Sequence, residues 1–129
     1  IAPNKRMLSS MSPTIVEENG KLRMVIGTPG GSTIITSVLQ CMLNVFEYGM
    51  TMQESVSKPR FHHQWLPDDV MFEPKGFDPM VISKLKAKGY VPKEENFVII
   101  GRVDAILVEK DGSLEGGADP RGDDVAVGF

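Results

Sequence analysis

The chain has 129 residues, 41% of them hydrophobic and 24% charged, and its formal net charge is −3 at pH 7. This composition is typical of a globular domain with a real core. The acidic balance and the lack of a basic stripe exclude a nucleic-acid-binding surface. The single cysteine, Cys41, excludes an internal disulfide and a zinc ligand set. Because it lies on the apolar side of a helical pattern, we expect a buried, inert thiol.

The start of the chain, Ile1 to Arg6, is neither a methionine start nor a signal peptide, which needs an apolar segment after its basic residues. We therefore expect the chain to begin inside a longer precursor. The uncharged stretch 24–46 is interrupted by Pro29, by three glycines and by two amide side chains. It is predicted not to span a membrane.

The first predicted elements are a hairpin and a helix. Residues 12–27 contain two apolar runs on either side of Asn19-Gly20, which is a strong signal for a tight hairpin turn. After Ser32 the apolar residues recur at steps of three and four, which predicts a helix that Gly49 ends. Ser32 or Thr33 is expected to cap its start.

The remaining elements are shorter. The pattern predicts a helix over 52–57, an extended or irregular stretch over 60–67 and a strand over 70–73. Asp78-Pro79 then opens a helix that Gly89 stops. Strands are predicted over 97–100 and 103–109, or as one strand broken at Gly101, and a final strand over 114–118. This order predicts a single-domain α/β (α+β) fold over residues 1–129, with helices covering a mostly antiparallel sheet. Few strands precede the first helix, so the sheet is expected to be incomplete, as in a fragment.

Gly30 and Gly31 form the most informative local feature, because they lie where the first hairpin changes into the first helix. Two glycines at a helix N-terminus leave backbone N–H groups unshielded at the end that carries partial positive charge. Such a turn suits an anion, including the oxyanion that develops during acyl transfer. The alternative is a tight turn with no further role, since glycine is the usual residue of strained turns.

Three hydroxyls, those of Ser9, Ser10 and Ser12, precede the first predicted strand. Hydroxyl and N–H groups at such a place can hold a carboxylate through several hydrogen bonds. The alternative interpretation is a turn or an unordered start.

Other polar groups give weaker signals. His62 and His63 precede Asp68 and Asp69, but adjacent residues of an extended segment point to opposite sides, so structural or surface roles are favoured over a shared metal ion. No serine lies in a Gly-x-Ser-x-Gly elbow. Near the end of the chain, three charged residues are expected to form an ion-paired terminal clamp: Asp119, Arg121 and Asp123. The chain thus offers places for an oxyanion and a carboxylate but no nucleophile.

Four segments together resemble the γ-glutamyltransferase (γ-glutamyltranspeptidase) family: residues 5–15 (KRMLSSMSPTI), 27–32 (GTPGGS), 59–64 (PRFHHQ) and 118–122 (ADPRG). The resemblance runs across the whole chain in the family's order and spacing, and corresponds to the C-terminal part of the small subunit. It implies an N-terminal-nucleophile hydrolase with an αββα sandwich, formed when a precursor cleaves itself into a large and a small subunit.

The resemblance also implies the chemistry and the site. In this family the first residue of the small subunit, a threonine, attacks the γ-amide of glutathione or a similar compound, with its own α-amine as base. The γ-glutamyl group then passes to water or to an acceptor amino acid or peptide. Ser9 and Ser10 match the serine pair that holds the donor's α-carboxylate, and Gly30 and Gly31 match the oxyanion-hole glycines. No cofactor or metal is implied.

The chain departs from the family pattern at its start, because Ile1 stands there and every threonine is internal. The nucleophile, the rest of the small subunit and the large subunit lie outside it, so the chain alone is predicted to be inactive. The family implies a periplasmic, secreted or surface-anchored location. Two alternatives stay open: a same-fold acylase or poly-γ-glutamate transferase, and a non-catalytic truncated homologue that acts as a binding or structural module.

Overall fold

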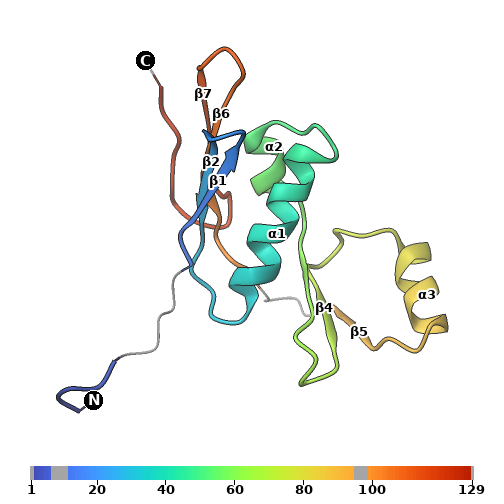
Figure 1. Cartoon of the computed structure of the whole chain (residues 1–129). Coiled ribbons are helices and arrows are strands. Elements are labelled where there is room, and N and C mark those ends of the chain that lie inside the picture. Colours follow the sequence, from blue (N-terminus) through green and yellow to red (C-terminus); the bar gives the residue numbers. More distant parts are fainter. Residues whose placement is uncertain (1, 7–11, 95–98, 129) are drawn as a thin grey trace.

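The structure is a computed structural model that describes residues 2–6, 12–94 and 99–128 (Figure 1). The larger of its two sheets has four strands. Its strand order is β1-β2-β6-β7, and all neighbouring strands are antiparallel. The strands are β1 (Thr14–Glu18), β2 (Lys21–Gly27), β6 (Asp104–Val108) and β7 (Leu114–Gly117). The predicted hairpin is confirmed: Asn19 and Gly20 both have positive φ (53° and 74°), as a tight primed turn requires.

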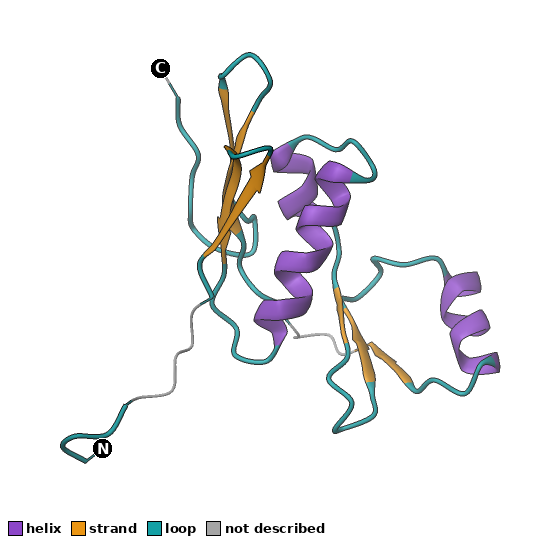
Figure 2. Ribbon diagram, in the orientation of Figure 1, coloured by secondary structure: helices purple, strands orange, loops and turns teal. Residues whose placement is uncertain are grey.

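Two helices cover one face of this sheet, as Figure 2 shows. They are α1 (Thr33–Phe46) and α2 (Met52–Ser57). The strand residues alternate, so that Met24 and Ile26 of β2 are buried under α1 while Val25 between them is exposed. Buried residues of the sheet and of both helices form one hydrophobic core: Met24, Ile26, Ile34, Val38, Cys41, Val45, Met52, Val56, Val103, Ala105 and Leu107.

The opposite face of the large sheet carries a row of apolar side chains. Ile15 pairs with Val25, and Val25 pairs with Ile106, so the three residues lie side by side across β1, β2 and β6. Their exposed fractions are 67%, 41% and 47%. The large sheet therefore has helices on one face only, and its apolar outer face is largely uncovered by the described residues.

Of the predicted helix ends, Asp78 and Gly49 are confirmed and the Ser32 cap is not, while the cap at Thr51 was not predicted. Thr51 caps α2 in a capping box with Glu54, and Asp78 accepts a hydrogen bond from the Met80 N–H (2.8 Å) at the start of α3 (Pro79–Ala87). Gly49, with φ 66°, follows the end of α1. Ser32 is the N-cap residue of α1, but its side chain makes no capping hydrogen bond.

A second, smaller sheet has the order β3-β4-β5 and lies on the other side of α1 (Figure 1). Its strands are β3 (Phe61–His62), β4 (Val70–Phe72) and β5 (Pro92–Glu94). β3 runs antiparallel to β4, whereas β5 is parallel to β4 after the crossover through α3. The Gln40 side chain of α1 bonds both the N–H and the carbonyl of Phe61, which attaches β3 to the helix.

The predicted strand over 97–100 is wrong where it can be compared. Residues 97 and 98 lie outside the described residues, and Ile99 and Ile100 are in a loop rather than a strand. Gly101, with φ 72°, breaks the extended conformation, and the carbonyls of Ile100 and Gly101 accept hydrogen bonds from the Arg60 side chain instead of from a strand. The stretch over 60–67, predicted to be extended or irregular, contains the two-residue strand β3, whereas the three-residue strand β5 was not predicted.

Among the described residues, no helix has both the length and the apolar character needed to cross a membrane. The stretch 24–46 divides between β2, the turn and α1, in agreement with the sequence analysis.

Candidate active site

The turn between β2 and α1 presents Gly30 and Gly31 at the N-terminus of the longest helix of the described chain. Both glycines are exposed. Their carbonyl oxygens accept hydrogen bonds from the N–H groups of Thr33 and Ile34, each at 3.2 Å. Their own N–H groups donate to no other described residue. Two unpaired donors at the positive end of a helix dipole are what an oxyanion or carboxylate requires.

The conformation of this turn needs glycine at its first position. Gly30 has φ 142°, and a Cβ atom there would lie 2.5 Å from Thr33 Oγ1 and 3.5 Å from the Gly101 Cα. The Thr33 hydroxyl donates to the Gly30 carbonyl at 3.0 Å, so it fixes the same residue from the helix side. Gly31 has φ 59°, and no atom lies within 4 Å of where its Cβ would be. Gly30 is thus confined by its neighbours, while Gly31 faces open space.

Ser9 and Ser10 lie outside the described residues, so their proximity to the turn stays a prediction.

The two histidines bind protein groups. His62 is 2% exposed, and its ring nitrogens contact Thr36 Oγ1 (2.7 Å) and Gln64 Oε1 (2.9 Å). His63 Nε2 lies 2.8 Å from Asp68 Oδ1, at the surface. Within the described ranges, no group of three histidine, cysteine or acidic side chains is arranged to hold a metal ion. His62 therefore supports the first turn of α1 through Thr36.

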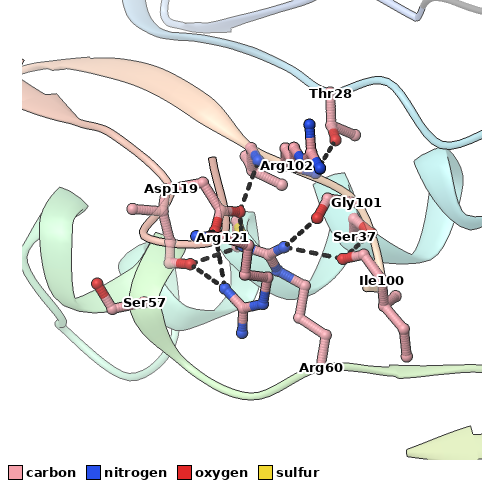
Figure 3. A network of polar contacts seen from close by, with 12 residues as sticks. Thr28, Ser37, Ser57, Arg60, Ile100, Gly101, Arg102, Asp119 and Arg121 are labelled. Atoms are coloured by element: carbon pink, nitrogen blue, oxygen red, sulfur yellow. Dashed lines mark hydrogen bonds and ion pairs between the residues drawn. The ribbon is translucent and has the colours of Figure 1, made fainter. Parts of the chain in front are cut away.

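A buried ionic cluster lies next to the loop of residues 100–102, which contacts the glycine turn through Thr28 (Figure 3). Arg60 Nη2 is 2.5 Å from Asp119 Oδ2, and these two residues are 1% and 0% exposed. Arg121 joins the cluster from the other side, with Nη1 2.9 Å from Asp119 Oδ1 and Nη2 2.5 Å from Glu73 Oε2. Two guanidinium groups thus face two carboxylates, an arrangement in which the charges compensate one another.

This cluster corrects the expected terminal clamp. Asp119 and Arg121 do pair, but Asp123 is exposed and forms no ion pair with a described residue. Arg60 and Glu73 take the remaining places, because β3 and β4 bring them beneath the last loop. Sequence reasoning missed both, since an arginine next to Pro59 and a glutamate after a short strand carry no signal of burial.

Cys41 is fully buried in the core, as predicted. Burial raises the pKa of its thiol, against the smaller opposing effect of the Arg60 charge. The thiol is therefore protonated and unreactive at neutral pH.

The charge of Asp119 makes stability depend on pH. Burial opposes ionisation, but hydrogen bonds from the N–H groups of Val103 and Arg121 and from the side chains of Arg60 and Arg121 outweigh it and lower the Asp119 pKa below its ordinary value. A carboxyl with a lower pKa in the folded state adds stability above about pH 4, and this stability is lost as the pH falls through the folded pKa.

We therefore expect Asp119→Asn to flatten the acid side of the profile of unfolding free energy against pH, measured by urea unfolding followed by circular dichroism. Asp104 is a matched control, because burial raises its pKa and the sign reverses: its contribution is present below about pH 4 and lost as the pH rises. A profile that Asp119→Asn and Asp104→Asn shift in the same direction would contradict the assignment.

Comparisons with known proteins show which family this chain resembles in sequence and fold. The family model of gamma-glutamyltranspeptidase matches residues 1–129. The chain is 50% identical over 131 aligned residues to the glutathione hydrolase proenzyme of Escherichia coli K12. The alignment covers 100% of this chain and 22% of that protein. The chain therefore spans about a fifth of the length of this curated relative.

Two solved structures share the fold. A mutant gamma-glutamyltranspeptidase of Helicobacter pylori superposes with a TM-score of 0.84 at 46% identity, over 95% of this chain and 66% of that chain. The enzyme of Pseudomonas nitroreducens complexed with L-DON gives a TM-score of 0.86 at 40% identity, over 100% and 67%. The α+β fold expected from the sequence is confirmed. The chain belongs to the gamma-glutamyltranspeptidase family.

Proposed function

We propose that this chain is the C-terminal portion of the small subunit of a γ-glutamyltransferase/glutathione hydrolase. The complete enzyme cleaves γ-glutamyl amides, such as glutathione, through a γ-glutamyl-threonine intermediate and transfers the group to water or to an amino acid or peptide. The observation that carries the proposal is the Gly30-Gly31 turn, whose two N–H groups are unpaired among described residues at the start of α1. Membership of the family supplies the reaction for which such donors are useful.

In the proposed reaction, the hydroxyl of a threonine outside this chain adds to the γ-carbonyl carbon of the donor, and its proton passes to that threonine's α-amine. The carbonyl oxygen becomes negatively charged and accepts hydrogen bonds from the N–H groups of Gly30 and Gly31. The C–N bond then breaks, the proton moves to the leaving amine, and a γ-glutamyl ester remains. Water or an acceptor amine repeats the addition and releases the threonine.

The donor's α-carboxylate is assigned to Ser9 and Ser10, whose hydroxyls can each donate one hydrogen bond. This contact fixes the donor at its far end, so that the γ-carbonyl reaches the glycine turn. A free α-carboxylate is thus part of what the enzyme recognises. It distinguishes γ-glutamyl donors from the amides that a same-fold acylase would take.

The proposed partners are the large subunit and the remainder of the small subunit. The apolar row of Ile15, Val25 and Ile106 on the outer face of the large sheet supports this, because an exposed apolar sheet face is a place where another layer packs. An αββα sandwich requires a second sheet on that face. The proposed location is the periplasm, the cell surface or the extracellular medium, in line with the family.

The test compares the isolated chain with a chimeric enzyme in which this chain replaces the 131-residue aligned segment of the E. coli proenzyme. We expect the isolated chain to release no chromophore from a γ-glutamyl anilide, since it lacks the threonine, and the chimeric enzyme to mature and release it. Competition between γ-glutamyl and other acyl donors on the chimeric enzyme then separates the transferase from an acylase. A chimeric enzyme that matures but stays inactive would support the non-catalytic alternative instead.

A further inference from the structure

The Thr28 side chain links the glycine turn to a second loop. Thr28 is the residue that follows β2, and it is only 6% exposed. Its hydroxyl donates to the Pro29 carbonyl at 2.7 Å and accepts the Arg102 N–H at 2.7 Å. The hydroxyl therefore both donates and accepts a hydrogen bond. One of these bonds holds the residue directly before Gly30, and the other reaches a loop 74 residues further along the chain.

The loop that Thr28 contacts is fixed from below. The carbonyls of Ile100 and Gly101 accept hydrogen bonds from Arg60 Nη1 at 2.8 and 3.3 Å, and Ser37 of α1 donates to the Ile100 carbonyl at 3.2 Å. Arg60 is in turn paired with Asp119. Figure 3 shows Thr28 and Arg102 above Gly101, Arg60 below it and Asp119 to its left. Thr28 therefore contacts a loop that the buried charges hold in place.

Close packing makes the turn sensitive to this contact. Gly101 has φ 72°, and a Cβ atom there would lie 2.9 Å from Thr28 Oγ1 and 2.7 Å from Ser37 Oγ. The position of a Cβ atom on Gly30 lies 3.5 Å from the Gly101 Cα. The backbones at Gly30 and Gly101 therefore face each other closely, and the Thr28 hydroxyl sets how the two loops meet. A shift of the second loop would move the turn.

We propose that Thr28 is a positioning residue for the oxyanion-binding turn. Its hydroxyl holds the Pro29 carbonyl and the 101–102 backbone together, and so aims the N–H groups of Gly30 and Gly31. This inference rests on the proposed function, since it assigns a purpose to the geometry of the turn. Thr28 lies under the turn and does not itself touch the donor's reacting atoms.

The test places Thr28→Val in the chimeric enzyme, because valine has almost the same shape and lacks the hydroxyl. A misplacement of about 1 Å can cost about 100-fold in rate, so we expect kcat to fall about 10- to 100-fold, with KM changed less than threefold. Thr28→Ser keeps the hydroxyl and is expected to restore kcat to within about threefold. Binding of a boronic-acid analogue, which mimics the tetrahedral intermediate, should weaken in Thr28→Val by a factor similar to the loss in kcat.

The matched control is Thr51→Val, which also removes a threonine hydroxyl that accepts a backbone N–H, at the start of α2 and away from the turn. Rates are normalised to the amount of processed small subunit. If Thr28→Val does not mature, Thr28→Ala is measured in its place. Equal kcat in Thr28→Val (or Thr28→Ala) and in Thr51→Val would overturn the inference, as would a failure of Thr28→Ser to restore the rate. An inactive wild-type chimeric enzyme would count against the proposed function itself.

Discussion

Replacing Gly30 by alanine in the chimeric enzyme is expected to lower kcat by about 100- to 1,000-fold, the usual cost of removing one oxyanion-hole donor. Gly30 has φ 142°, which an alanine rarely adopts, and the added Cβ would lie 2.5 Å from Thr33 Oγ1. To relieve both, the backbone must rotate, and the rotation turns the N–H away from the oxyanion. KM should change far less than kcat, because the lost bond forms mainly in the transition state. The measurement is steady-state kinetics with a γ-glutamyl anilide.

The matched control for Gly30→Ala is Gly20→Ala in the β1–β2 turn. Gly20 also has positive φ (74°), and no atom lies within 4 Å of where its Cβ would be. This variant carries backbone strain of about 1–2 kcal/mol without touching the site, and we expect it to keep its kcat. A Gly30→Ala enzyme that matures normally and retains kcat within threefold would contradict the assignment of the turn.

Replacing Arg60 by methionine is expected to destabilise the chain by about 3–5 kcal/mol, because it leaves two buried carboxylates, Asp119 and Glu73, facing the single guanidinium of Arg121. Arg60 also donates to the Val56 carbonyl at 2.6 Å and to the Ile100 carbonyl at 2.8 Å, so the substitution removes partners from buried backbone groups as well. The measurement is the free energy of unfolding in urea, followed by far-ultraviolet circular dichroism.

The matched control for Arg60→Met is Lys93→Met. Lys93 pairs with Asp69 at 2.7 Å, but its side chain is 47% exposed, so the expected loss is below about 1 kcal/mol. The double variant Arg60→Met/Asp119→Asn should be more stable than the sum of the single losses predicts, since Arg121 then faces one carboxylate, Glu73, instead of two. A loss below 1 kcal/mol in Arg60→Met would show that the cluster does not hold the fold together.

Local rules predicted the elements whose signals lie within a few residues. Asn19-Gly20 marks its own turn, and the apolar spacing after Ser32 marks α1, so both could be placed without knowing the rest of the chain. The turn at Gly30 and Gly31 could be placed for the same reason, since it lies between an adjacent strand and helix, while its role as an oxyanion hole stays a prediction. Ser9 and Ser10 stay a prediction, carried by the family resemblance.

The features that sequence reasoning missed depend on distant partners. Arg60 is charged, and charged residues are almost never fully buried unless they are paired. Its partner Asp119 lies 59 residues away, so no local sequence pattern predicts the pair. Short strands such as β3 and β5 are likewise defined by β4 between them rather than by their own two or three residues. The terminal clamp was half right: Asp119 and Arg121 do pair, but the other members of the cluster, Arg60 and Glu73, lie far away in the sequence.

The pairing of β2 with β6 also has a consequence for the order of events during synthesis. Every contact described here that fixes the Gly30 turn from outside its own helix comes from residues nearer the C-terminus: Arg102 contacts Thr28 across 74 positions, and Arg60 holds the 100–101 carbonyls. At about 5–20 residues per second, a ribosome needs about 4–15 seconds to add that separation. Until then, the turn lacks the hydrogen bond between Thr28 and the Arg102 N–H. The contacts that support this turn therefore form only after residue 102 has been added.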